Sequence, residues 1–295
     1  MKLSQLQHLV AIVKFGSLRA AARELDTPQP VLTRNIRMLE KELGGALFVR
    51  ESKGMVLSSI GRLFHARASL IVNESQRAMD EVAQSLGEEH GAVAIALSIM
   101  PHIAMLPRAL PQFRARYPNV RIQIIEGLFP NAEQALRDGV IDFYLGAAPK
   151  SAVMPGLSSE LIMENTRAVV ARKGHPLSQA TSFSQLAQAE WATTAVDYDA
   201  AHDLEQVYDS YGLPRPRIVL NAKSALSMMV AISSSDLLAM LPMQWNDFTL
   251  TRDALEVIPL QERFPAPDIV MVKRTGLPLT PAAEFFADVL LRQVP

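Results

Sequence analysis

The sequence has no cysteine among its 295 residues. Disulfide bonds, thiolate metal sites and cysteine nucleophiles are therefore excluded. The chain also lacks a run of about 18 consecutive apolar residues, the length that a membrane-spanning helix needs. Its first residues show no basic segment followed by an apolar one, so we expect no secretory signal, no membrane partner and a cytoplasmic location.

Net charge is nearly absent overall but is unevenly spread. Hydrophobic residues make up 49% and charged residues 20%, which supports sizeable cores, and the length favours two or three domains. Residues 1–60 contain nine lysines or arginines and five acids, a net charge of +4, so the other 235 residues carry −5 of the total of −1. A basic first segment favours a polyanionic partner for that segment.

Three helices are predicted in the first 45 residues. Apolar residues recur at helical spacing from residue 3 to 13, Gly16 ends this run, and Ser17 is the expected N-cap of an alanine-rich second helix. The third helix ends at Gly44. Its apolar stripe, expected to face the core, consists of Leu32, Ile36, Leu39 and Leu43. Residues 47–57 then predict a small hairpin or wing.

Two prolines, Pro28 and Pro30, stand where the third helix begins. The first N–H groups of a helix have no intrahelical partner, so proline is tolerated there. We predict that Thr27 caps this helix. The prolines then set the entry angle of its leading end.

The second and third helices have the length, the packing alanines and the tight connection of a helix-turn-helix. Since a recognition helix presents its N-terminal residues to base edges, Gln29 can pair with adenine, Arg34 with guanine, and Pro30 can contact a thymine methyl. The candidate DNA contacts are Gln29, Pro30, Thr33, Arg34 and Arg37 on the helix, with Ser17, Arg50 and Lys53 placed for phosphates. The alternative is a helix face that only meets solvent.

No proline occurs between residues 58 and 89, and apolar residues recur there at helical spacing. This predicts one helix of up to about 45 Å. A small head cannot bury such a helix, so we expect a partner helix from a second subunit. The alternative is that the helix lies on the rest of its own chain.

From residue 92 onward the pattern changes to alternating strands and helices. Strands are predicted at 92–98, 120–127, 140–146, 167–173, 191–195, 217–222, 237–241 and 268–274, and helices at 101–118, 131–139, 182–188, 200–212, 224–233 and 280–293. This alternation favours a parallel, helix-covered sheet in two α/β lobes. Ligands of such sheets bind at the carboxyl ends of the strands.

Enzymatic signatures are scarce. Asp199, His202 and Asp203 lie within one helical turn and could ligate a metal, but solvated acids at a helix start are commoner. Neither a nucleophile elbow nor a phosphate-binding glycine loop is present. We therefore predict no catalytic residue, no metal site and no cofactor.

The segment 16-GSLRAAARELDTPQPVLTRNIRMLEKELGGALFVRESKGMVLSSIG-61 resembles the winged helix-turn-helix signature of LysR-type transcriptional regulators. A Gly-Ser pair opens the second helix, Gln-Pro opens the recognition helix, and a Leu-Glu-x-x-Leu-Gly-x-x-Leu-Phe-x-Arg run follows. The chain departs from the family pattern at three positions: Pro28 and Thr33 replace serines, and Ser58 replaces threonine. Thr33 preserves the hydroxyl.

The resemblance extends over the whole chain and implies its organisation. An all-α head with a winged helix-turn-helix (1–58) is followed by a long linker and dimerisation helix (59–89). A two-lobed α/β effector domain that resembles periplasmic binding proteins (90–295) completes the chain. Lobe I would comprise 91–160 and 265–293, and lobe II 161–264. Where the family has a glycine-rich turn before the strand at 237–241, this chain has Ser233-Ser234-Ser235-Asp236.

The resemblance also implies partners and an effector site. The partners are double-stranded DNA, a small organic anion, further copies of the chain in a dimer of dimers, and RNA polymerase. Ser98 precedes a helix whose N-terminus suits an anion, although a serine there can simply cap the helix. The implied effector contacts are Ser98, Met100, Pro101, Phe129, Thr194, Val196 and Lys223.

Stretches 211–218, 235–242 and 276–283 resemble regulators of aromatic acid and aromatic sulfonate catabolism. We therefore expect a transcriptional regulator whose effector class includes aromatic anions. The alternative is a cytoplasmic solute-binding protein whose basic head serves oligomerisation.

Overall fold

The computed structural model describes residues 1–51, 54–127, 129, 131–194, 200–245 and 248–295, with the backbone alone for residues 50, 51 and 54. The chain divides into two compact units. Unit 1 is Met1–Glu88 with Ala135–Val140, and unit 2 is Glu89–Gln134 with Ile141–Pro295. Across the described ranges, no helix combines the length and apolarity needed to cross a membrane.

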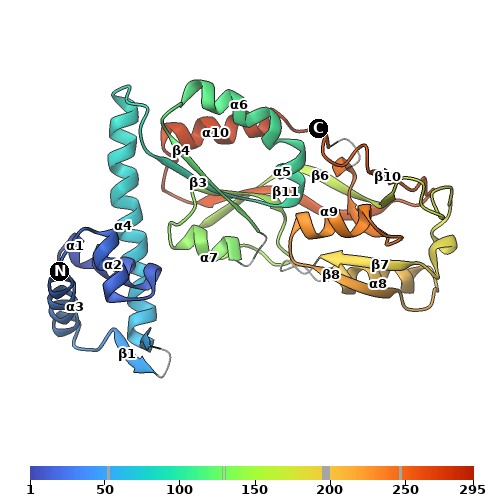
Figure 1. Ribbon diagram of the computed structural model, residues 1–295. Coiled ribbons are helices and arrows are strands. Elements are labelled where there is room, and N and C mark those ends of the chain that lie inside the picture. The colour runs from blue at the N-terminus through green and yellow to red at the C-terminus, as the bar shows by residue number, and fades with distance from the viewer. Residues whose placement is uncertain (52–53, 128, 130, 195–199, 246–247) are drawn as a thin grey trace. The chain divides into compact units, whose positions relative to one another are not determined.

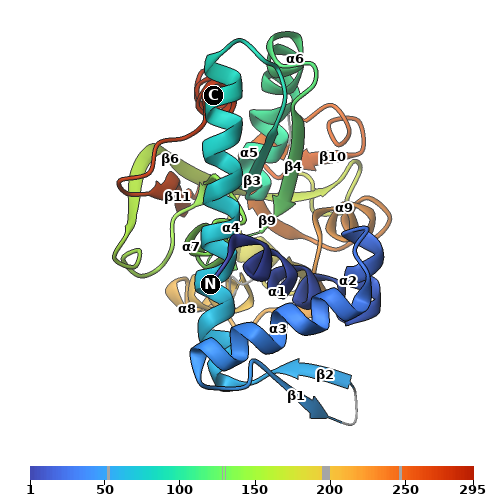
Figure 2. The same cartoon turned by 90° about the vertical axis from the view of Figure 1, so that its left-hand side faces the viewer.

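Unit 1 contains three short helices, a hairpin and one long helix (Figure 2). They are α1 (Leu3–Phe15), α2 (Leu18–Glu24), α3 (Gln29–Leu43), β1 (Phe48–Glu51), β2 (Gly54–Leu57) and α4 (Ser59–Ser85). Gly16 ends α1 in the left-handed conformation, and Ser17 caps α2 by accepting the Ala20 N–H at 3.1 Å. Strands β1 and β2 pair antiparallel, which confirms the predicted hairpin.

Two expectations for α3 are wrong. Thr27 does not cap the helix: Pro28 occupies the N-cap position, and the Thr27 hydroxyl donates to the Leu25 carbonyl at 3.0 Å. The cause is the turn before the helix, where Asp26 has a positive φ of 45°. Leu43 is 37% exposed, because it lies in the last turn and outside the core cluster that buries the rest of the apolar stripe.

Helix α4 begins after Ser58, whose hydroxyl accepts the Gly61 N–H at 2.9 Å. Its 27 residues span about 40 Å. Its first turns pack on the core of the head, through Phe64 and Ala68 among others. Large apolar side chains remain exposed along and just after it: Leu63, Ile71, Met79, Val82 and Leu86.

The strands and helices that follow residue 91 belong to unit 2, except that the second part of α7 belongs to unit 1. The strands are β3 (Ala92–Leu97), β4 (Arg121–Glu126), β5 (Phe143–Ala147), β6 (Leu157–Arg172), β7 (Glu190–Thr194), β8 (Arg217–Ala222), β9 (Ala239–Pro242), β10 (Leu255–Val257) and β11 (Phe264–Arg274). The helices are α5 (Ile99–Ala104), α6 (Leu106–Arg116), α7 (Asn131–Arg137), α8 (Ala200–Ser210), α9 (Ala225–Ser233) and α10 (Pro281–Leu291), with short 3₁₀ turns η1 (Phe183–Leu186) and η2 (Met243–Trp245).

The main sheet of unit 2 is mixed, so the prediction of a parallel sheet is wrong. Its order is β10-β6-β11-β5-β3-β4, and β9 also pairs with β6. Strand β3 runs parallel to β4 and β5, whereas β11 runs antiparallel to both β5 and β6. The difference arises because β11, from near the C-terminus, inserts between β5 and β6, and a sequence-order pattern does not reveal this insertion.

The unit has two lobes, as predicted. In one lobe, α6 and α10 pack side by side on one face of the sheet (Figure 1), and their side chains share one core with β3 and β5. In the other, α8 and α9 flank the parallel pair β7–β8, around two further cores. Both β6 and β11 are long enough to serve both lobes. Their pairing is interrupted by one register shift between Ala266 and Ile269, near Pro267, which lacks an N–H, and by a second between Ile269 and Val270.

Three predicted elements differ in extent or type. The single helix expected at 101–118 is broken at Met105, because Pro107 starts a new helix, α6. The strand expected at 167–173 is the second half of the 16-residue β6. The helix expected at 182–188 is only the 3₁₀ turn η1.

Candidate DNA-binding surface and effector cleft

The outer face of α3 forms an open depression on unit 1. Its lining residues are Gln29, Pro30, Thr33, Arg34, Arg37, Met38 and Lys41. All five helical residues predicted to contact DNA are among them. Sequence reasoning missed Met38 and Lys41, although Lys41 follows Arg37 by four residues and therefore lies on the same face.

The charges of this face are unbalanced. In the part of the chain that the structure describes, Arg34, Arg37 and Lys41 are exposed and make no ion pair. The acids of α3 are used elsewhere: Glu40 accepts the Leu47 N–H at 2.8 Å, and Glu42 pairs with the terminal amine at 2.7 Å. The outer face of α3 is therefore cationic.

The remaining predicted DNA contacts lie around this helix. The hydroxyl of Thr33 donates to the Gln29 carbonyl at 3.1 Å, which holds the side chain against the first turn. Ser17 is exposed at the N-terminus of α2. Arg50 lies in β1, where the structure describes only its backbone, and Lys53 lies outside the described residues.

A part-buried hydrogen bond joins α3 to α1. The Asn35 amide donates to His8 Nδ1 at 2.9 Å, so this ring nitrogen carries no proton. Burial lowers the pKa of His8. Burial therefore favours the neutral ring, and the bond ties α3 to α1.

In unit 2, a cavity of about 120 Å³ lies at the crossing of the two lobes. The lobe with α6 and α10 contributes the residues after β3, β4 and β5, and the other contributes β7, α8, α9 and β9. The described lining residues are Ser98, Ile99, Met100, Glu126, Gly127, Ala147, Asn165, Arg167, Ala192, Thr193, Thr194, Ala200, Leu204, Met228, Met240, Leu241, Pro242, Ala266, Pro267 and Ile269. Most are apolar, and the carboxyl ends of β3, β4 and β5 meet here, as expected for an α/β site.

Ser98 is buried after β3 and occupies the N-cap position of α5, but its side chain makes no capping hydrogen bond. Its hydroxyl oxygen accepts the Ala147 N–H at 3.2 Å, and the Tyr144 hydroxyl donates to the Ala147 carbonyl at 2.9 Å. Burial raises the pKa of Tyr144, so this phenol stays protonated. A Cβ on Gly146 would lie 2.5 Å from the Tyr144 oxygen and 2.7 Å from the Ser98 Cβ, so glycine permits this packing.

Three of the seven predicted effector residues line the cavity: Ser98, Met100 and Thr194. Three others, Pro101, Phe129 and Lys223, are not among its described lining residues. Pro101 is buried in α5, and Lys223 is exposed between β8 and α9. The Phe129 ring packs edge-on against Tyr144, at 5.0 Å between ring centroids. Val196 lies outside the described residues.

Sequence reasoning missed the polar groups on β6 and β7. Arg167, on β6, is one of the lining residues. Its Nε donates to the Pro265 carbonyl at 3.0 Å, and its Nη1 lies 3.5 Å from an Asp203 carboxylate oxygen. Thr193 is 5% exposed, and its hydroxyl has no partner among the described residues. No local signal marked these positions, because their role depends on how β6 and β7 meet across the lobes.

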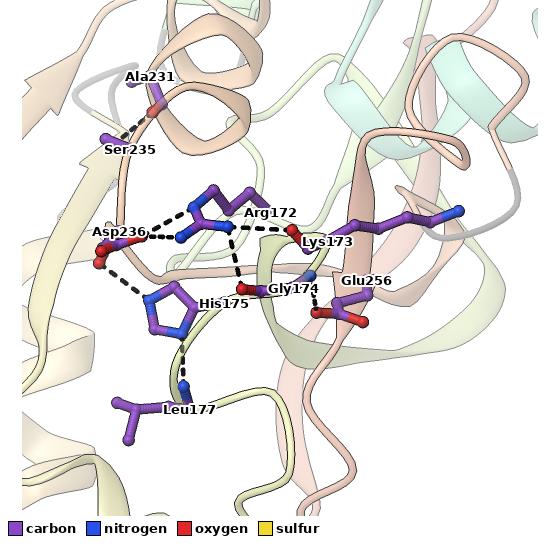
Figure 3. Close-up of polar contacts among 9 residues, drawn as sticks. All are labelled: Arg172, Lys173, Gly174, His175, Leu177, Ala231, Ser235, Asp236 and Glu256. Carbon is purple, nitrogen blue, oxygen red and sulfur yellow. Dashed lines mark hydrogen bonds and ion pairs between the residues drawn. The ribbon is translucent and has the colours of Figure 1, made fainter.

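The Ser233–Asp236 turn, which contains no glycine, is held by hydrogen bonds and an ion pair of its side chains (Figure 3). The Arg172 guanidinium pairs with the Asp236 carboxylate at 2.6 and 2.8 Å, and His175 Nε2 lies 3.1 Å from the Asp236 carbonyl oxygen. The Ser235 hydroxyl donates to a carbonyl in the last turn of α9 at 2.6 Å. These bonds tie the end of α9 to the end of β6.

Comparisons with known proteins match both parts of the chain. Residues 3–62 match the family described as "Bacterial regulatory helix-turn-helix protein, lysR family", and residues 86–295 match the "LysR substrate binding domain". The HTH-type transcriptional regulator GalR of Pseudomonas putida is 27% identical over 282 residues, covering 95% of this chain and 70% of that protein. The "SDS degradation transcriptional activation protein" of a Pseudomonas species is 27% identical over 302 residues, covering 98% and 95%.

Solved structures share the fold. CbnR, titled a LysR family transcriptional regulator, superposes with a TM-score of 0.70 at 19% identity, over 100% of both chains, and so does CbnR in complex with its target DNA. Full-length OxyR from Pseudomonas aeruginosa gives a TM-score of 0.72 at 21% identity, over 98% of this chain and 94% of that one. The curated relatives are regulators of transcription, in agreement with the expectation that the chain is not an enzyme. The chain therefore belongs to the LysR family of DNA-binding transcriptional regulators.

Proposed function

We propose that residues 1–58 read an operator, that 59–89 form a linker and dimerisation helix, and that 90–295 bind an effector. Lobe I would comprise 91–160 and 265–293, and lobe II 161–264. The observation that carries the DNA-reading role is the cationic face of α3. Its two acids bind other groups of the head, while Arg34, Arg37 and Lys41 face solvent. A cationic helix face binds phosphates and reads base edges in the major groove.

Within this proposal the residues of α3 have distinct roles. Gln29 and Arg34 read bases, Pro30 supplies an apolar contact, and Thr33 and Arg37 complete the surface. Backbone contacts come from Ser17, Arg50 and Lys53. Lys41, at the far end of the same depression, adds a phosphate contact that sequence reasoning did not include.

Fluorescence anisotropy with DNA from upstream of the chain's own gene or a divergent one tests this role. Arg34→Ala is expected to lose about 1–3 kcal/mol of discrimination between operator and scrambled DNA. Lys41→Ala is expected to weaken both DNAs alike and to lower the salt slope by about 1. Arg215→Ala, which removes an exposed arginine from unit 2, is the matched control. Salt-independent binding, or an Arg34→Ala protein with unchanged preference, would contradict the proposal.

The assembly proposed is a dimer of dimers. The exposed apolar side chains of α4 support a partner helix from a second copy, since an isolated chain leaves them in water. We also propose a cytoplasmic location and a contact with RNA polymerase at the promoter. The match of the head to a helix-turn-helix family removes the support for a solute-binding protein whose head serves only assembly.

The effector proposed is a small organic anion, aromatic acids included, bound in the cavity of unit 2. Support comes from the apolar lining around a few polar groups, among them Ser98, Thr194 and Arg167. One relative is named for degradation of SDS, which also combines an apolar body with one anionic group. Binding shifts the relative angle of the lobes and thereby the population of DNA-bound assemblies.

A further inference from the structure

A turn from far along the chain is packed on the long helix of unit 1. Residues Ala135–Val140, the end of α7 and the turn after it, belong to the same compact unit as the head and α4. Two side chains of α4 bind this turn. The Asn73 amide donates to the Asp138 carbonyl at 3.0 Å, and Arg77 Nη2 donates to the Gly139 carbonyl at 2.8 Å. Carbonyls at the end of a helix lack partners within it, so α4 supplies their donors.

Gly139 permits the close approach. Its φ of +67° lies in the left-handed region. A Cβ there would lie 3.1 Å from Arg77 Nη1, 3.2 Å from Leu70 Cδ1 and 3.4 Å from Asn73 Cβ. These three residues of α4 follow one another at spacings of three and four, so they share one face of the helix. Met79, an exposed apolar residue, is nine positions from Leu70 and lies on about the opposite face, so the contact is separate from that part of the apolar surface proposed for a partner helix.

The turn held by α4 lies within a connection whose two ends line the cavity of unit 2. Gly127 comes directly after β4, and Ala147 ends β5. Both ends are bonded to the end of β3. The Gly127 N–H donates to the Leu97 carbonyl at 3.2 Å, and the Ala147 N–H donates to the Ser98 hydroxyl at 3.2 Å. The chain that runs from one cavity-lining residue to the other therefore passes through the turn that α4 binds.

Helix α7 makes this connection stiff. Ala132 and Leu136 on the helix are buried, and the Glu133 carboxylate accepts the Met154 N–H at 2.8 Å. The turn after the helix is closed by the Gly139 N–H, which donates to the Leu136 carbonyl at 3.1 Å. A packed helix moves as a body, so a displacement at a cavity-lining end reaches the turn.

We propose that Asn73 and Arg77 are positioning residues that couple the occupancy of the cavity to the linker helix, by holding the turn after α7. This inference rests on the proposed effector role of the cavity and on the proposed DNA-reading role of the head. An effector that displaces Gly127 or Ala147 alters the two bonds to the turn. Helix α4 carries the change to the head, because its first turns share the core of the head. Coupling of binding is reciprocal, so DNA bound to the head changes the cavity-lining ends in return.

The test uses the full chain with DNA as the probe, taken from upstream of its own gene or a divergent one. Hydrogen exchange, followed by mass spectrometry, reports on the peptides that contain Gly127 and Ala147, with and without saturating DNA. A third peptide, which contains Gly139, reports on the turn itself. Circular dichroism shows whether each variant is folded, and anisotropy shows whether it binds DNA.

Four variants separate coupling from support of the fold. Asn73→Asp keeps the shape of the side chain and replaces its donor by an acceptor, and Arg77→Met removes the second donor. Arg77→Lys can still donate to the turn. Arg67→Met, at an exposed position of the same helix, is the matched control for Arg77→Met.

We expect DNA to change the exchange rates of both cavity peptides in the wild type by about 5-fold or more, the lower end of typical couplings. Arg77→Lys and Arg67→Met should keep this response. Asn73→Asp and Arg77→Met should bind DNA and lose the response, with faster exchange at Gly139.

A contact that only supports the fold would give faster exchange at Gly139 in these variants and leave the response of the cavity peptides to DNA intact. That result would overturn the inference, and so would a DNA-bound wild type whose cavity peptides do not respond. If Asn73→Asp fails to fold, the comparison of Arg77→Met with Arg77→Lys decides. Failure of the wild type to bind DNA would instead count against the proposed function.

Discussion

Replacing Thr193 by valine is expected to stabilise unit 2 while weakening its binding of anions. The two side chains have nearly the same volume and differ by a hydroxyl against a methyl. The Thr193 side chain is 5% exposed, and its hydroxyl has no partner among the described residues. A buried polar group without a partner costs about 1–3 kcal/mol, so valine should raise the free energy of unfolding by about 1 kcal/mol or more. For a unit of about 200 residues this raises Tm by about 2–4 °C.

The assay can report unit 2 alone. The two tryptophans of the chain, Trp191 and Trp245, are both buried in that unit, so their fluorescence during urea unfolding follows it and not the head. Thr193→Ser is the control, since it keeps the hydroxyl and loses a buried methyl, with an expected loss of about 1 kcal/mol. In parallel, Thr193→Val should bind benzoate about 5- to 10-fold more weakly. A less stable valine variant would show that the hydroxyl has a partner in the folded chain, and the reasoning would then fail.

Two further outcomes follow from the packing. Gly146→Ala should destabilise unit 2 by about 2–3 kcal/mol, because the new Cβ would lie 2.5 Å from the buried Tyr144 oxygen. A Cβ on Gly127 would meet nothing within 4 Å among the described residues, so Gly127→Ala should change stability by less than about 0.5 kcal/mol in the same urea assay. Burial lowers the pKa of His8 below its unfolded value of 6.5, so the neutral ring stabilises the head above that pH, and this contribution is lost as the pH falls through the lower pKa of the folded state. Circular dichroism between pH 7.5 and 5 should show that the stability of the head falls as the pH falls. In His8→Gln, whose amide oxygen can still accept from Asn35, stability should depend less on pH. A pH dependence that His8→Gln leaves unchanged would show that other groups cause the loss.

Local periodicity predicted the head well. The spacing of Leu32, Ile36 and Leu39 identifies the buried stripe of α3, and the opposite face must then carry Gln29 and Arg34. A helix has 3.6 residues per turn whatever surrounds it, so neighbours in sequence determine which side chains share a face. The errors at Thr27 and Leu43 fell at the ends of the helix, where backbone turns compete with the helical pattern.

The α/β unit was predictable in its alternation but not in its pairing. The apolar pattern within a strand indicates which of its faces are buried, but it does not indicate which strand pairs with it. The insertion of β11 between β5 and β6 was therefore missed. The polar groups of the cavity depend on that pairing. Arg167 and Asp203 are 36 residues apart in sequence, and only the crossing of β6 with β11 and the packing of α8 bring them together.

The amino-acid sequence by itself determined the helix-turn-helix head, the cationic face of α3, the long proline-free helix and the two-lobed organisation. Each of these depends on residue spacing within one element or on the order of elements. Only the tertiary structure decided the mixed sheet, the pairing of Arg167 with Asp203 and the burial of the Thr193 hydroxyl without a partner among the described residues. The physical reason is that partners and burial in a sheet are set by contacts between distant segments, and no local pattern encodes those contacts.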